Sequence, residues 1–139
     1  MKSDAKPILL VEDDLIDTMT VRRALKALHI TNPIAHAEHG EAALAWLGDT
    51  RNDRPCLILL DLNMPVMGGI EFLRSVKTEG NPLRRIPVIV LTTSEEQRDK
   101  VESFDLGVAG YIRKPVDYQR FVDTMRTVDA YWTISEIPE

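Results

Sequence analysis

The chain is poor in cysteine, in excess basic charge and in long apolar runs, and each shortage excludes a class of protein. Its 139 residues include one cysteine, Cys56, so an internal disulfide cannot form and a reducing compartment is expected. Lys and Arg number 17 against 22 Asp and Glu, and the net charge of −5 argues against a nucleic-acid partner. Apolar runs such as Leu57–Leu60 are far shorter than the ~20 residues of a membrane span, and the charged N-terminus lacks a signal-peptide core. We therefore expect a cytoplasmic protein with no membrane contact.

Short apolar runs alternate with helical patterns along the whole chain. The runs that we expect to form strands are Ile8–Val11, Ile34–Ala37, Leu57–Leu60, Val88–Leu91 and Gly110–Ile112. Val88–Leu91 is apolar at every position, which is typical of a strand that is covered on both faces. Between the runs, apolar residues recur at helical spacing. This order, β-α repeated five times, predicts one α/β domain over residues 1–139 with a doubly wound, five-stranded parallel sheet.

Local signals indicate where helices begin and end. Asp14 is placed to cap the first helix, and Ser94-x-x-Gln97 has the form of a capping box for the fourth. An apolar stripe from Phe121 to Trp132 predicts a long last helix, which the C-terminal tail, residues 129–139, extends.

Residues with reactive or charged side chains follow four of the five predicted strands. Glu12 and Asp13 follow the first strand, Asp61 the third, Thr92 the fourth and Lys114 the fifth. Because the carboxyl ends of parallel strands meet at one edge of a sheet, we expect these side chains to converge. Carboxylates held close together repel one another, which favours a cation, and Mg²⁺ prefers such oxygen ligands. A lysine and a hydroxyl beside a metal-bound aspartate suit phosphoryl transfer, in which an aspartate can be the covalent acceptor.

Four stretches resemble the response-regulator receiver domains of two-component signalling. They are Ile8–Asp14, Leu59–Gly69, Pro87–Ser94 and Gly110–Pro115, and the resemblance runs from about Pro7 to Trp132. It implies a flavodoxin-like (βα)5 fold with strand order 2-1-3-4-5. It also implies a phosphorelay switch rather than an enzyme, phosphorylated by a sensor histidine kinase and assisting its own Mg²⁺-dependent phosphorylation and dephosphorylation.

The resemblance implies a role for each matching residue. Asp61 is the phosphoacceptor and a Mg²⁺ ligand. The other implied Mg²⁺ ligands are Asp13, Glu12 (mainly through water) and the backbone carbonyl of Asn63. Thr92 and Lys114 are implied to bind phosphoryl oxygens. Tyr111 is implied as the switch aromatic, which turns inward as Thr92 moves toward the phosphate, and the Lys114-Pro115 peptide is often cis in the family.

Two other classes use a similar fold or site. A phosphatase-type hydrolase with an aspartyl nucleophile usually has a second Asp two residues later, where this chain has Asn63. A flavodoxin-like flavin carrier needs a glycine- or hydroxyl-rich phosphate loop after the first strand, where this chain is acidic. A metal pair at His36-x-x-His39 lacks a third ligand in the sequence.

The loop lengths and the tail around Tyr131–Pro138 resemble the single-domain regulators that pair with phytochrome-type photoreceptor kinases. That resemblance implies a phytochrome-type kinase as partner and a homodimer whose interface includes the tail. Because few residues follow the last helix, we expect output through a downstream protein, a phosphorelay step or a phosphate sink rather than through an attached DNA-binding domain.

Overall fold

A sheet of five parallel strands forms the centre of the computed structural model, which describes residues 6–114 and 117–135. The strands are β1 (Ile8–Val11), β2 (Ile34–Ala37), β3 (Leu57–Leu60), β4 (Val88–Thr92) and β5 (Gly110–Arg113). Their order in the sheet is β2-β1-β3-β4-β5, which confirms the predicted flavodoxin-like topology. The predicted strand bounds hold except that β4 and β5 each continue for one more residue.

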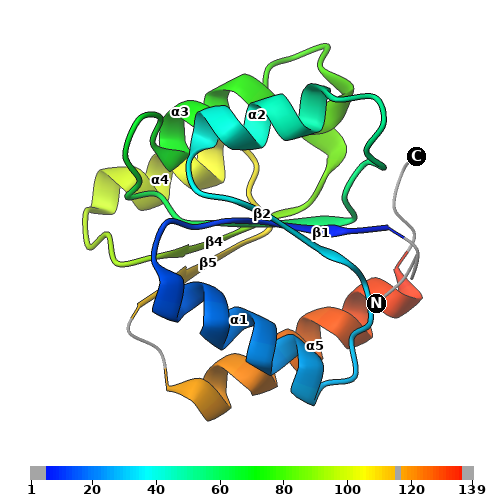
Figure 1. The fold of residues 1–139 in the computed structure, drawn as a ribbon. Coiled ribbons are helices and arrows are strands. Elements are labelled where there is room, and N and C mark those ends of the chain that lie inside the picture. The colour runs from blue at the N-terminus through cyan, green and yellow to red at the C-terminus, as the bar shows by residue number, and fades with distance from the viewer. Residues whose placement is uncertain (1–5, 115–116, 136–139) are drawn as a thin grey trace.

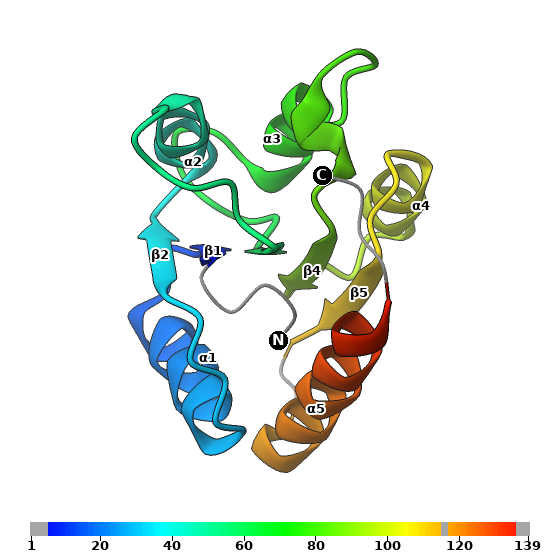
Figure 2. The same ribbon diagram turned by 90° about the vertical axis from the view of Figure 1, so that its right-hand side faces the viewer.

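Helices cover both faces of the sheet. They are α1 (Leu15–Ala27), α2 (Gly40–Gly48), α3 (Gly69–Val76), the short 3-10 helix η1 (Pro82–Arg85), α4 (Gln97–Asp105) and α5 (Tyr118–Ile134). Figures 1 and 2 show α1 and α5 on one side of the sheet and α2, α3 and α4 on the other. In the residues that the structure describes, no helix is long and apolar enough to cross a membrane.

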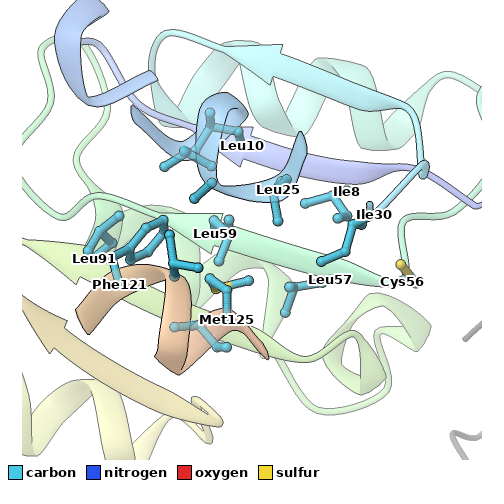
Figure 3. Packing of buried hydrophobic residues seen from close by; sticks show 14 residues of the cluster. Ile8, Leu10, Leu25, Ile30, Cys56, Leu57, Leu59, Leu91, Phe121 and Met125 are labelled. Atoms are coloured by element: carbon cyan, nitrogen blue, oxygen red, sulfur yellow. The ribbon is translucent and has the colours of Figure 1, made fainter. Parts of the chain in front are cut away.

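Alternate strand residues supply two separate cores, one on each face. Leu10 and Leu59 pack with Leu25 of α1 and with Phe121 and Met125 of α5 (Figure 3). Their sequence neighbours point the other way, into a second core with α3; its members include Leu9, Leu60, Phe72, Leu73 and Val76. Because both faces are covered, every position of β1, β3 and β4 is buried, which explains why these runs are apolar or small throughout.

The two predicted helix caps have different outcomes. The side chain of Asp14 accepts a hydrogen bond from the Asp17 N–H at 3.0 Å, which confirms the cap of α1. The predicted capping box at Ser94 is wrong, because α4 begins at Gln97 with Glu96 in the cap position. The hydroxyl of Ser94 donates instead to Oδ2 of Asp99 at 2.6 Å. The same hydroxyl accepts the Glu96 N–H at 3.4 Å, so it stabilises the turn before α4 instead of capping the helix.

The last helix, α5, is the longest of the described helices. It runs to Ile134, and near its end the rings of Tyr131 and Trp132 meet edge to face with centroids 5.1 Å apart. Residues 136–139 of the predicted tail lie outside the described residues, and so does Pro115 with its predicted cis bond.

Candidate functional site

Three carboxylates gather at the carboxyl edge of the sheet. Glu12 and Asp13 follow β1 and Asp61 follows β3, and one ligand oxygen from each lies within 4.8 Å of the others. The parallel ladder causes this convergence, because the Asp61 N–H donates to the carbonyl of Val11 at 3.0 Å. Glu12 and Asp61 are buried and Asp13 is exposed. Such an all-oxygen ligand set, open on one side, fits a hard divalent cation.

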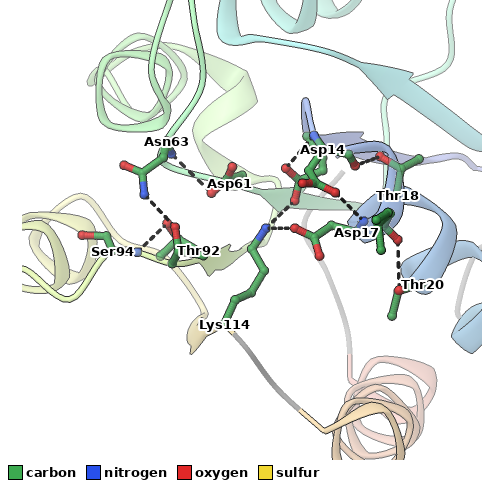
Figure 4. Close-up of polar contacts among 12 residues, drawn as sticks. Asp14, Asp17, Thr18, Thr20, Asp61, Asn63, Thr92, Ser94 and Lys114 are labelled. Atoms are coloured by element: carbon green, nitrogen blue, oxygen red, sulfur yellow. Dashed lines mark hydrogen bonds and ion pairs between the residues drawn. The ribbon is translucent and has the colours of Figure 1, made fainter.

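Lys114 reaches this cluster from the end of β5 (Figure 4). Its Nζ donates to Oε1 of Glu12 at 2.8 Å and to Oδ2 of Asp17 at 2.5 Å, and the side chain is only 8% exposed. Burial lowers the pKa of Lys114, but the hydrogen bonds to Asp17 and Glu12 and the charge of Asp61 more than offset it, so its pKa lies above the usual value. The ammonium group therefore stays charged in the site.

For Glu12, in contrast, the surroundings disfavour the charged form, because its carboxylate is buried beside that of Asp61. Its pKa is raised from 4.5 to about 7: burial is the main cause, the charge of Asp61 adds to the shift, and the hydrogen bond from Lys114 opposes it. A buried carboxylate in this position gains from a cation, which would remove the unfavourable interaction with Asp61.

Hydroxyl and amide groups line the β3 and β4 side of the site (Figure 4). Thr92 is fully buried, and its Oγ1 accepts from the Ser94 N–H at 3.2 Å. Asn63 donates its backbone N–H to Oδ1 of Asp61 at 3.3 Å and its side-chain amide to Oγ1 of Thr93 at 3.1 Å. These bonds connect the loop after β3 to the loop after β4 across the predicted phosphoacceptor.

Tyr111, the predicted switch aromatic, packs on the side of the sheet that α4 covers. Its ring lies 6.3 Å from that of Phe104, and its hydroxyl is buried without a hydrogen-bond partner at bonding geometry among the described residues. Burial raises the pKa of Tyr111, and the nearby Ser94 side chain opposes the shift.

The structure places all seven predicted site residues at this edge of the sheet or directly beside it, but it also shows a contact that the sequence reasoning missed. Asp17 lies in the first turn of α1 and pairs with Lys114, 97 positions away in the chain. The sequence signal that could have indicated this contact was an acidic residue, Asp17, about one helical turn after the acidic residues that follow β1.

The two histidines of the His36-x-x-His39 motif do not form a metal pair. His36 Nε2 contacts the backbone oxygen of Glu12 at 2.7 Å, and His39 Nδ1 caps α2 by accepting the Ala42 N–H.

Comparisons with known proteins identify the class of protein that this fold and site define. The family model of the response regulator receiver domain matches residues 8–126. The response regulator Rcp1 of Synechocystis is 39% identical over 132 residues, covering 91% of this chain and 88% of that protein.

Solved structures agree with the sequence comparison. The crystal structure of the Mn²⁺-bound form of response regulator Rcp1 has a TM-score of 0.84 at 35% identity, covering 96% of this chain and 99% of that one. The structure of the phosphorylated cyanobacterial phytochrome response regulator RcpA also has a TM-score of 0.84, at 34% identity, covering 97% and 99%.

The chain therefore belongs to the response regulator receiver domain family of two-component signalling. Its members are signalling proteins rather than enzymes in the ordinary sense, which displaces the hydrolase and flavin-carrier alternatives.

Proposed function

We propose that the domain accepts a phosphoryl group on Asp61 from a sensor histidine kinase and that the acyl phosphate switches a protein-interaction face. One observation carries the proposal: a buried aspartate lies among two further carboxylates, a buried ammonium and a buried hydroxyl at one edge of the sheet. This combination is what transfer of a phosphoryl group onto a carboxylate requires.

In the proposed transfer, an oxygen of Asp61 forms a bond to phosphorus as the bond from phosphorus to the donor nitrogen breaks. The donor histidine leaves with its electron pair and takes a proton. Lys114 and Thr92 then hold oxygens of the transferred group, so that an ammonium and a hydroxyl stabilise the charge that collects there. Lys114 must give up part of its contact with Glu12 to do so.

Mg²⁺ is the proposed cofactor, held by Glu12, Asp13, Asp61 and the backbone carbonyl of Asn63. The fit rests on the three oxygen ligands within 4.8 Å and on the raised pKa of Glu12, which a cation would reverse. Binding of Mn²⁺ by the related Rcp1 structure supports a divalent ion. When bound, the ion would neutralise charge on the phosphoryl oxygens.

The proposed switch couples Thr92 to Tyr111. Thr92 lies two residues after Val90, the β4 residue that pairs with Tyr111, and so on the same face of the strand; a shift of its hydroxyl toward the phosphoryl group would change the packing beside the ring. Such a change is a two-state equilibrium that phosphorylation biases. The face that it would alter contains α4, β5 and α5.

A phytochrome-type histidine kinase is the proposed upstream partner, and a homodimer that includes the end of α5 is the proposed assembly. The likeness to the cyanobacterial phytochrome response regulator supports the first. For the second, Tyr131 and Ile134 leave 58% and 82% of their surfaces exposed near the end of α5. Sedimentation over a range of concentrations tests the dimer, which a monomer at every concentration contradicts.

Intact-mass spectrometry after incubation with acetyl phosphate or phosphoramidate tests the proposed function. We expect one phosphoryl adduct with Mg²⁺ and none with EDTA. The adduct should disappear in Asp61→Asn and persist in Asp53→Asn, a matched change at an exposed aspartate in the loop before β3. An adduct of the same yield in Asp61→Asn, or none in the parent with either donor, contradicts the proposal.

A further inference from the structure

Lys114 bridges two carboxylates that have different places in the site. Glu12 belongs to the cluster with Asp13 and Asp61, whereas Asp17 lies outside that cluster, on α1. We propose that Asp17 is a positioning residue that retains the ammonium group of Lys114 when a divalent cation binds the cluster, and that it thereby raises the affinity for the cation. This inference rests on the cation site of the proposed function.

Lys114 and the cation compete for the carboxylate of Glu12. Both need the same carboxylate, because the ammonium group lies 2.8 Å from Oε1 of Glu12, whose side chain is 2% exposed. A cation on Glu12 and Asp61 repels the ammonium group at short range, and in a buried site solvent screens that repulsion only weakly. Lys114 therefore needs another acceptor if it is to stay in the site.

Asp17, which is outside the carboxylate cluster, provides that acceptor. Its Oδ2 lies 2.5 Å from Nζ of Lys114, and its side chain is 33% exposed, so water as well as the ion pair solvates its charge. Asp17, Thr20, Lys114 and Phe121 also line a cavity of about 240 Å³, which gives the lysine side chain room to shift toward α1. Asp17 is thus placed to hold Lys114 while Glu12 turns to the cation (Figure 4).

Removal of the Asp17 charge changes the competition. Without it, the charged partners left to Lys114 among its described contacts are Glu12 and the nearby Asp61. The ammonium group then occupies the ligands that the cation requires. Asp17→Asn should therefore weaken Mg²⁺ binding through Lys114, in addition to the small effect of removing any negative charge near the site.

Calorimetric titration of the whole chain with MgCl₂ tests this in a double-mutant cycle. We expect Asp17→Asn to weaken binding about fivefold, as for a partly exposed ion pair, and Asp17→Glu to restore most of it. Asp14→Asn is the matched control, because it removes a neighbouring exposed carboxylate that does not contact Lys114, and asparagine still caps α1. It should weaken binding by about twofold or less.

The decisive comparison uses a lysine-free background, Lys114→Met, with Lys114→Gln as a second form should the first fold poorly by circular dichroism. There the loss caused by Asp17→Asn should shrink to that of the control, since no ammonium group is left to position. An equal loss with and without Lys114, or an equal loss in Asp14→Asn and Asp17→Asn, overturns the inference and leaves the cation site intact. A parent protein that binds no Mg²⁺ overturns the cation site itself and the inference with it.

Discussion

Gly69 lies directly against the backbone of Asp61. A Cβ at Gly69 would come within 2.5 Å of the Asp61 carbonyl oxygen and within 2.6 Å of the Cα of Leu62. Both atoms belong to the backbone, so neither can move away without moving the chain beside the proposed phosphoacceptor. The Gly69 N–H also donates to the carbonyl of Leu62 at 3.0 Å, which fixes the start of α3 at this close approach.

Gly69→Ala should therefore lower the free energy of unfolding by about 1–3 kcal/mol, the usual cost of an overpacked buried site. Gly48→Ala is the control, because a Cβ there meets nothing within 4 Å at the end of α2. It should be neutral or stabilise by up to about 1 kcal/mol. Urea unfolding measures both variants, and equal stability of the two contradicts the close approach.

The buried Glu12 makes a prediction for the metal-free protein. Its pKa is about 7 in the folded state against 4.5 ordinarily, so between these values the unfolded chain releases a proton that the folded chain keeps. The free energy of unfolding in EDTA should fall as pH rises through this window, by on the order of 1–3 kcal/mol.

Glu12→Gln removes the titrating group, so its stability should depend less on pH than that of the parent over the same range. Saturating Mg²⁺ favours the ionised carboxylate and should flatten the profile of the parent as well. Parallel pH profiles for parent and Glu12→Gln in EDTA would show that Glu12 titrates normally.

Cys56 should be an unreactive thiol in the native protein. It is buried directly before β3, and burial raises the pKa of its thiol, so little thiolate forms near neutral pH. Labelling by a disulfide reagent should be at least about 100-fold slower in the folded chain than in urea. Similar rates in both conditions would mean that this end of the sheet opens readily.

Lys114→Ala should separate phosphorylation from the switch. Asp61 remains available, but the ammonium group that we propose to hold a phosphoryl oxygen is gone, so the proposed coupling of Thr92 and Tyr111 to the acyl phosphate should be lost. The ring signals of ¹³C-labelled tyrosine, assigned through Tyr111→Phe, report the switch. The parent signal of Tyr111 should shift on phosphorylation and the variant signal should not. An equal shift in both would place the coupling elsewhere.

The sequence alone predicted the sheet and the convergence of charged and hydroxyl side chains at its carboxyl edge, because both follow from periodic or local signals. Runs such as Ile8–Val11 are apolar at every position, and this pattern predicts a buried strand whatever side chains pack against it. The convergence of Asp13 and Asp61 follows from parallel pairing of β1 with β3: the β-α repeat predicts that the strands are parallel, and the resemblance to receiver domains supplied their order.

The wrong prediction and the missed contact both involve side chains whose partners are set by the three-dimensional packing of the chain. Ser94 has the residue type and spacing of a cap, but its hydroxyl binds Asp99 and helix α4 begins two residues later than a cap at Ser94 would place it. The ion pair of Asp17 with Lys114 depends on how α1 packs against α5 and the sheet, and no spacing in the sequence encodes it. Tertiary packing decides both contacts.

Mapping the phosphoryl group to a residue tests the central claim most directly. Borohydride reduces an aspartyl phosphate to homoserine, which peptide sequencing by mass spectrometry can place in the chain after phosphorylation in Mg²⁺. The account predicts homoserine at position 61 alone, and none when EDTA is present during phosphorylation. Homoserine at another aspartate, or a stable adduct that yields none, would contradict the assignment of Asp61 as the phosphoacceptor.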